Sequence, residues 1–219
     1  LNSMNYFIKL QFDDLYNFKY KLSLKEDISF DNINDLTNKY GNNTSETLNI
    51  EIKDKDDNRV SNTLFVDDAN QYVRFINKDY KFIKLTKNNG VYVTYKFRDK
   101  YNLKIGDTVK WHVYGDKKYY ESKVVGFYRD PQVQGLSATK EYLESLGIEY
   151  KPDAIYTNKN LSHVKTIKNV DIVQNIEELK EAISSMLSMM RKMIIIIIAF
   201  AILLGVIIIY NMGILSYSE

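Results

Sequence analysis

The stretch that decides the fold is Met193-Ile-Ile-Ile-Ile-Ile-Ala-Phe-Ala-Ile-Leu-Leu-Gly-Val-Ile-Ile-Ile-Tyr210, and no charged residue follows it before Leu215. A helix rising about 1.5 Å per residue needs roughly 20 residues to cross the hydrocarbon core of a bilayer. Each mid-bilayer Ile or Leu favours insertion by about 0.3–0.6 kcal/mol. The sequence therefore predicts a membrane-spanning helix over residues 193–215. The alternative, a buried core helix, is usually shorter and carries a polar face.

The helix is expected to begin well before the apolar run. Asn175 is followed by Glu178 at the third helical position, which is the arrangement of a capping box. No helix-breaking residue lies between Glu177 and Leu204. We expect a stalk over residues 175–192 that continues without interruption into the membrane helix, giving a rod roughly 60 Å long.

The residues before the stalk predict a mixed α+β head. Residues 1–24 alternate loosely between aromatic or aliphatic and polar side chains, which predicts one or two strands. A helix is predicted over residues 30–40, with Asp31 as N-cap and Gly41 as its end. Further short helices are predicted at 96–102 and 139–146, and strands at 47–53, 59–66, 72–76, 81–85, 91–95, 108–114, 119–128, 154–156 and 170–173.

The turn signal Asn88-Asn-Gly90 suggests a division of the head into two small lobes. The first would be an α+β lobe over residues 1–89, and the second a β-rich lobe over residues 90–174. The predicted fold class is thus α+β, with two small lobes followed by a long stalk helix that is continuous with a transmembrane helix.

Composition excludes several kinds of chemistry. The chain has no Cys, so disulfides, thiolate metal sites and a Cys nucleophile are ruled out. Its net charge of +2 gives no reason to expect a nucleic-acid partner. No Gly-rich phosphate loop and no catalytic triad or carboxylate pair stands out. We therefore predict no catalytic residue, no metal, no cofactor and no enzymatic activity.

Two patterns could be mistaken for ligand sites. Asp54-Lys-Asp-Asp-Asn58 resembles the start of a calcium loop, but Arg59 and Phe65 stand where an EF-hand needs Gly and Glu. A solvated hairpin tip is the better interpretation. His112 and His163 have no second His or carboxylate at ligand spacing, so a structural or solvated role is expected for both.

The C-terminal residues resemble a known family. Ile208-Ile-Tyr-Asn-Met-Gly-Ile-Leu-Ser-Tyr-Ser-Glu219 is similar to the end of the second membrane helix in FtsX-like (MacB-type) permeases of ABC transporters. The matching positions are Asn211, Gly213, Ser216 and Glu219. Residues 90–94, 101–109 and 123–128 are similar to the extracytoplasmic domain of that family. The resemblance covers residues 88–219 well and residues 1–87 loosely.

The resemblance implies a topology and a mechanism. Residues 1–192 would be extracytoplasmic, 193–215 would cross the cell membrane, and 216–219 would begin a cytoplasmic motif. Arg191-Lys192 alone would favour a cytoplasmic head by the positive-inside rule; we follow the resemblance. Both ends of the chain look cut, which indicates a segment of a longer membrane protein.

The partners implied are membrane lipid, a separate ATPase subunit, a second permease in a homo- or heterodimer, and a partner protein outside the cell. The permease would couple ATP hydrolysis to a conformational change outside, for export of a peptide, antibiotic or lipoprotein or for activation of a partner. Ala199, Ala201 and Gly205 are small residues that would let two such helices approach closely. Two alternatives are a single-pass surface sensor or adhesin with a β-rich binding domain, and a membrane-anchored hydrolase, which the missing catalytic residues disfavour.

Overall fold

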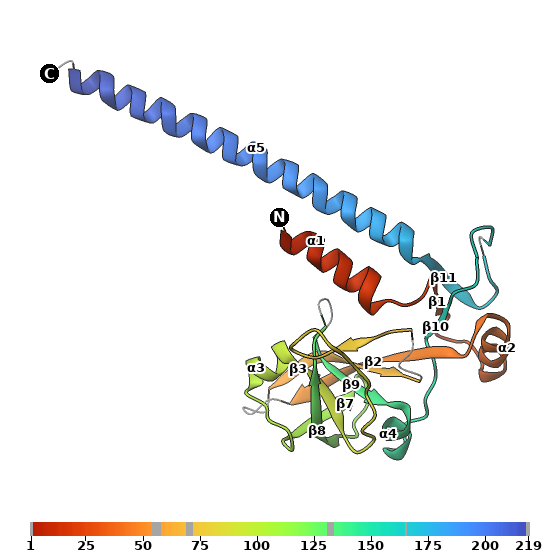
Figure 1. Ribbon diagram of the computed structural model, residues 1–219. Helices are drawn as coiled ribbons and strands as arrows, with labels where there is room; N and C mark the ends of the chain where they lie inside the picture. The colour runs from red at the N-terminus through yellow and green to blue at the C-terminus, as the bar shows by residue number, and fades with distance from the viewer. Residues whose placement is uncertain (1, 54–57, 69–71, 131–133, 165, 218–219) are drawn as a thin grey trace. The chain divides into compact units, whose positions relative to one another are not determined.

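The computed structural model describes residues 2–53, 58–68, 72–130, 134–164 and 166–217 (Figure 1). The chain divides into two compact units, Leu1–Glu177 and Glu178–Glu219. The first is a mixed α+β head and the second is helical, so the predicted fold class is confirmed. The finer boundary at residues 89–90 stays a prediction.

The elements follow the chain in this order: α1 (Asn2–Ile8), the π-helix η1 (Lys9–Leu15), β1 (Tyr20–Leu24), α2 (Phe30–Tyr40), β2 (Asn43–Lys53), β3 (Arg59–Asp67), β4 (Phe75–Ile76), β5 (Phe82–Ile83), β6 (Val91–Thr94), α3 (Tyr95–Tyr101), β7 (Thr108–Val113), β8 (Tyr120–Tyr128), β9 (Leu136–Thr139), α4 (Lys140–Ser145), β10 (Ala154–Thr157), β11 (Val170–Asn175) and α5 (Ile176–Tyr217). Within the described residues, nine strands form one sheet in the order β11-β1-β10-β2-β3-β9-β6-β8-β7, and β4 pairs with β5 apart from it.

Part of this sheet closes into a barrel. The far end of β2 also pairs with β7, with Glu51 opposite His112 and Ile52 opposite Trp111. Strands β2, β3, β9, β6, β8 and β7 therefore form a closed ring, which removes free edges. Alternate side chains fill its interior, and Trp111 is fully buried there with its Nε1–H donating to Ser122 Oγ at 2.8 Å.

A second hydrophobic cluster lies beside the barrel. It joins β1, β10 and β11 to helix α2, through the buried side chains Tyr20, Leu22, Leu24, Ile33, Leu36, Tyr40, Ile155 and Val170 among others. Strand β2 belongs to both parts, because residues 43–45 pair with β10 and residues 50–53 pair with β7. The two clusters draw on segments from both sides of residue 90.

The start of the chain differs from its prediction. Residues 2–15 form α1 and η1, and only β1 matches the one or two strands expected over residues 1–24. Leu10 and Leu15 are buried with Ile76, so packing against β4 decides the local conformation here. The apolar spacing of a π-helix departs from the 3.6-residue period, and the alternation of aromatics resembles that of a strand.

Helix α2 and the hairpin after β2 were also predicted. Helix α2 is capped by Ser29, whose Oγ accepts from Asn32 N at 3.4 Å, so the assignment of Asp31 as N-cap was wrong. Gly41 ends this helix as expected, at φ +141°. The hairpin tip predicted at residues 54–58 lies outside the described residues, apart from Asn58.

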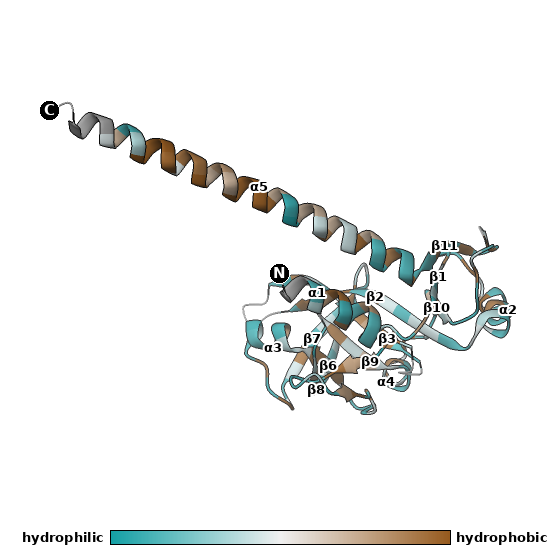
Figure 2. Ribbon diagram, turned by 45° about the horizontal axis from the view of Figure 1, so that its top comes forward, coloured by the Kyte–Doolittle hydropathy of each residue, from teal (hydrophilic) through white to brown (hydrophobic). Residues whose placement is uncertain are grey.

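Helix α5 agrees with its prediction. It is unbroken over 42 residues, about 63 Å at 1.5 Å per residue. Asn175 Oδ1 accepts from Glu177 N at 3.0 Å, which confirms the predicted N-cap. Its middle part is long and apolar enough to cross a membrane and is not buried. Figure 2 shows hydrophilic turns near its start giving way to a hydrophobic stretch. A core helix of this chain would bury these side chains, so their exposure favours the membrane-spanning alternative.

Candidate functional site

The small residues predicted for helix packing do not all share one face of α5. Ala201 and Gly205 are four residues apart, which places them on the same side one turn apart. Ala199 lies about 160° around the axis from Ala201, at about 100° per residue. A Cβ at Gly205 would meet nothing within 4 Å. The structure thus brings Ala201 and Gly205 together and sets Ala199 apart, and their role in packing stays a prediction.

The positions that carry the family resemblance lie at the end of α5. Asn211 and Gly213 belong to the described helix and are exposed. Ser216 falls within the helix, whereas Glu219 lies outside the described residues. No described contact joins these positions to one another, so the structure leaves the predicted motif untested.

The first residue of α5 directly follows a strand of the sheet in the head. Strand β11 ends at Asn175 and α5 begins at the next residue. Ile176 is buried, and its N–H donates to the Lys19 carbonyl oxygen at 2.9 Å. Along its whole length β11 pairs with β1. A displacement of the first turn of α5 would therefore act directly on two hydrogen-bonded strands.

The carboxyl groups of buried Glu46 and of Asp153 lie where strand β10 and the segment before it meet β2. The segment before β10 crosses the near end of β2: Lys151 N donates to Glu46 Oε2 at 3.0 Å, and Thr47 N donates to Asp153 Oδ2 at 2.8 Å. Asp153 N in turn donates to the Ser45 carbonyl oxygen at 2.9 Å. We call residues 43–47 and 150–156 the junction.

Burial raises the pKa values of the carboxyl groups in the junction. Loss of solvation is the main cause that raises the pKa of Glu46 to about 7, partly opposed by the hydrogen bond from Lys151 and supported by the charge of Asp153. Burial also raises the pKa of Asp153, opposed by the hydrogen bond from Thr47. The Glu46 carboxyl group is therefore protonated in a substantial fraction of molecules near neutral pH.

Two tyrosines complete the junction. The Tyr150 hydroxyl lies 3.0 Å from Thr44 Oγ1, and the Tyr156 hydroxyl lies 2.7 Å from Ser45 Oγ. Burial raises the pKa of both tyrosines, so both stay neutral. The Tyr156 hydroxyl links β10 to β2, and the Tyr150 hydroxyl links the segment before β10 to β2.

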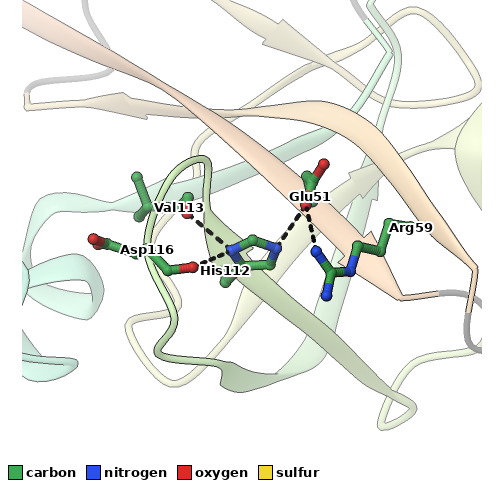
Figure 3. Close-up of polar contacts among 5 residues, drawn as sticks. All are labelled: Glu51, Arg59, His112, Val113 and Asp116. Carbon is green, nitrogen blue, oxygen red and sulfur yellow. Dashed lines mark hydrogen bonds and ion pairs between the residues drawn. The ribbon is translucent and has the colours of Figure 1, made fainter.

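An ion pair lies at the seam where β7 closes onto β2 (Figure 3). His112 Nε2 is 2.8 Å from Glu51 Oε2, and Arg59 Nη1 is 3.9 Å from the same oxygen. His112 Nδ1 faces the carbonyl oxygens of Val113 and Asp116 at 2.9 and 2.8 Å. The two ring nitrogens therefore face a carboxylate oxygen on one side and two backbone carbonyl oxygens on the other. His112 is therefore buried and hydrogen-bonded rather than solvated.

The Glu51–His112 pair links strand β2 to strand β7 at a buried position. His112 is buried, and its ring packs on Tyr119 with 4.6 Å between the centroids. Within the described residues, no group of three or more His, Asp or Glu side chains could hold a metal ion. Sequence reasoning missed the Glu51–His112 pair because 61 positions separate the two residues and only the β2–β7 pairing brings them together.

We compared the chain with known protein families, sequences and structures. No protein-family model and no curated protein sequence matches the chain. Among solved structures, the periplasmic region of MacB from Actinobacillus actinomycetemcomitans is similar at a TM-score of 0.45 and 11% sequence identity, over 81% of this chain and 97% of that one. The TM-score and the identity are too low for this match to identify a family.

Proposed function

We propose that this chain is part of an FtsX-like permease subunit of an ABC transporter, and that it couples the work of a separate ATPase to a movement of the head outside the cell. The observation that carries the proposal is the unbroken helix α5, which starts inside the sheet of the head and continues into an exposed apolar stretch. The residues similar to the permease family, among them Asn211, Gly213 and Ser216, lie at its far end.

The attachment of α5 to the head supports a mechanical role. A flexible linker would absorb movement, whereas β11 passes into α5 with no intervening residue. The bond from Ile176 N to Lys19 O and the pairing of β11 with β1 hold this point. A shift or rotation of the membrane segment would therefore be transmitted to strands rather than lost in a loop.

A proline in the stalk tests this role. Ser188 lies in α5 between the head and the apolar stretch, and Pro there removes a helix hydrogen bond and kinks the axis. In the complete transporter, Ser188→Pro should abolish the extracytoplasmic response while nucleotide turnover persists, and the control Ser188→Ala should behave as wild type. Transport that survives Ser188→Pro would refute the coupling role of α5.

Topology provides a second test. Because the chain has no Cys, a single Cys introduced in place of exposed Lys117 can be labelled selectively in intact cells. A membrane-impermeant maleimide should react at this position without permeabilisation if the head is extracytoplasmic. Reaction only after permeabilisation would overturn the proposed orientation. A gene that encodes only one membrane span in total would favour the surface sensor or adhesin.

A further inference from the structure

One segment of the head concentrates positive charge. Residues 72–104 contain nine Lys and Arg but only two Asp. The whole chain has a net charge of +2, so the rest of it is net negative. The asymmetry is therefore local, and it needs a cause beyond the high Lys content of the chain.

Exposed aromatic rings lie among these charges. Phe82 is 58% exposed, with the Arg74 guanidinium 5.2 Å from its ring centroid. Tyr80 is 46% exposed; its ring centroid lies 4.6 Å from the Arg129 guanidinium and 5.6 Å from the ring centroid of Tyr6. We call residues 74–84, with Tyr6 and Arg129 that contact Tyr80, the basic aromatic surface; its exposed charges are Lys78, Lys81 and Lys84 and the single carboxylate Asp79.

The loop that carries Tyr80 is held in one conformation. Asn77 Oδ1 accepts from both Asp79 N and Lys81 N, at 2.9 and 3.0 Å. Lys78 N donates to the Tyr95 hydroxyl at 3.2 Å. Tyr80 itself adopts φ +60°, a left-handed conformation that is unfavourable for a residue with a side chain. The fold thus keeps a strained residue at the point where an aromatic ring is presented to the outside.

We propose that the basic aromatic surface docks on a membrane that carries anionic lipid headgroups. Lys is depleted in the centres of protein–protein interfaces, whereas clustered Lys and Arg are attracted to anionic lipid headgroups. Tyr and Phe rings favour the level of the headgroups, where one part of the ring is in contact with lipid and the other with water. The inference rests on the proposed insertion of α5, because that tether keeps the head close to a bilayer.

The test uses the full chain in nanodiscs of phosphatidylcholine, with or without phosphatidylglycerol as the anionic lipid. An environment-sensitive NBD dye is attached at Phe82→Cys, and in a matched control at Ile172→Cys on β11, a position that is also 58% exposed. We expect the emission at position 82 to rise about twofold or more and to shift to the blue only with phosphatidylglycerol. Position 172 should respond equally in both lipids, and about 0.5 M NaCl should suppress the signal at position 82.

Charge-reversal variants test whether the lysines of the basic aromatic surface attract the anionic lipid. Lys81→Glu with Lys84→Glu should abolish the lipid-dependent signal at position 82. Lys117→Glu with Lys118→Glu, the same charge change at exposed lysines between β7 and β8, should leave it intact. Unchanged fluorescence of buried Trp111 shows that each variant is folded.

Several results would overturn the proposal: no change at position 82, the same change in both lipids, the same change at position 172, or a response to added polyglutamate but not to lipid. Co-migration of the chain with nanodiscs in gel filtration separates the two levels of inference. If the chain inserts but the emission at position 82 does not change, docking alone is refuted. If the chain does not insert, both the membrane role of α5 and the docking are refuted.

Discussion

Replacing Glu46 with Gln should change how the stability of the head depends on pH. The pKa of Glu46 is about 7 in the folded chain and its ordinary value is 4.5. Between these values the folded state binds more protons at this group than the unfolded state, so its contribution to stability is complete below pH 4.5 and is lost as the pH rises through 7. The amide of the Glu46→Gln variant would keep an acceptor for Lys151 N without ionising.

The two pKa values set the size of the pH-dependent change in the free energy of unfolding. Their separation corresponds to a ceiling of about 3 kcal/mol. Access of water to the carboxyl group reduces this, and we expect about 1–2 kcal/mol. Glu46→Gln should therefore gain about 1–2 kcal/mol over wild type between about pH 5 and pH 8. For a head of this size the gain corresponds to roughly 2–8 °C in Tm.

Urea denaturation of the detergent-solubilised chain provides the assay. Trp111 is the single Trp of the chain and lies in the barrel core, so its fluorescence follows the unfolding of the head. Glu149→Gln, at an exposed position in the same part of the chain, is the control and should follow the wild-type pH dependence. A constant difference between Glu46→Gln and wild type across the same pH range would show that Glu46 does not titrate there.

Two further substitutions test the barrel, both by urea denaturation. Gly90→Ala should destabilise the head by at least about 2–3 kcal/mol, because its Cβ would lie 2.1 Å from the Lys123 carbonyl oxygen; a loss below about 0.5 kcal/mol would contradict the close approach. Glu51→Ala should cost about 1–3 kcal/mol, because it removes the partner of buried His112 Nε2. Its control is Glu121→Ala, which breaks only an exposed ion pair and should stay within about 0.5 kcal/mol; equal losses for the two variants would argue against a stabilising link through the Glu51–His112 pair.

Features that depend on neighbours in the sequence could be predicted. The apolar run over residues 193–215 and the cap at Asn175 define α5, because length, composition and local hydrogen bonding suffice for a helix. Helix α2 and the strands β3, β7 and β8 also follow from period and turn residues. Here the local preference and the tertiary environment agree.

Features created by distant contacts could not be predicted. The closure of the barrel joins β2 to β7, and no local pattern marks Glu51 and His112, 61 positions apart, as partners. Helix η1 was missed because its burial against Ile76 decides a conformation that the aromatic alternation did not favour. The junction was missed for the same reason, because Glu46 and Lys151 are 105 positions apart.

The strand order defines where the head can bend if α5 transmits movement. From β11 a displacement passes through β1 and β10 before it reaches β2 and the barrel. The β10–β2 step has three registered residue pairs, whereas β2 and β3 share nine, so the junction is the weaker link. Its side-chain bonds from Tyr150 and Tyr156 hold this link, and we expect ionisation of buried Glu46 to lower the stability of the folded head. If the proposed coupling passes through the junction, we therefore expect it to depend on pH.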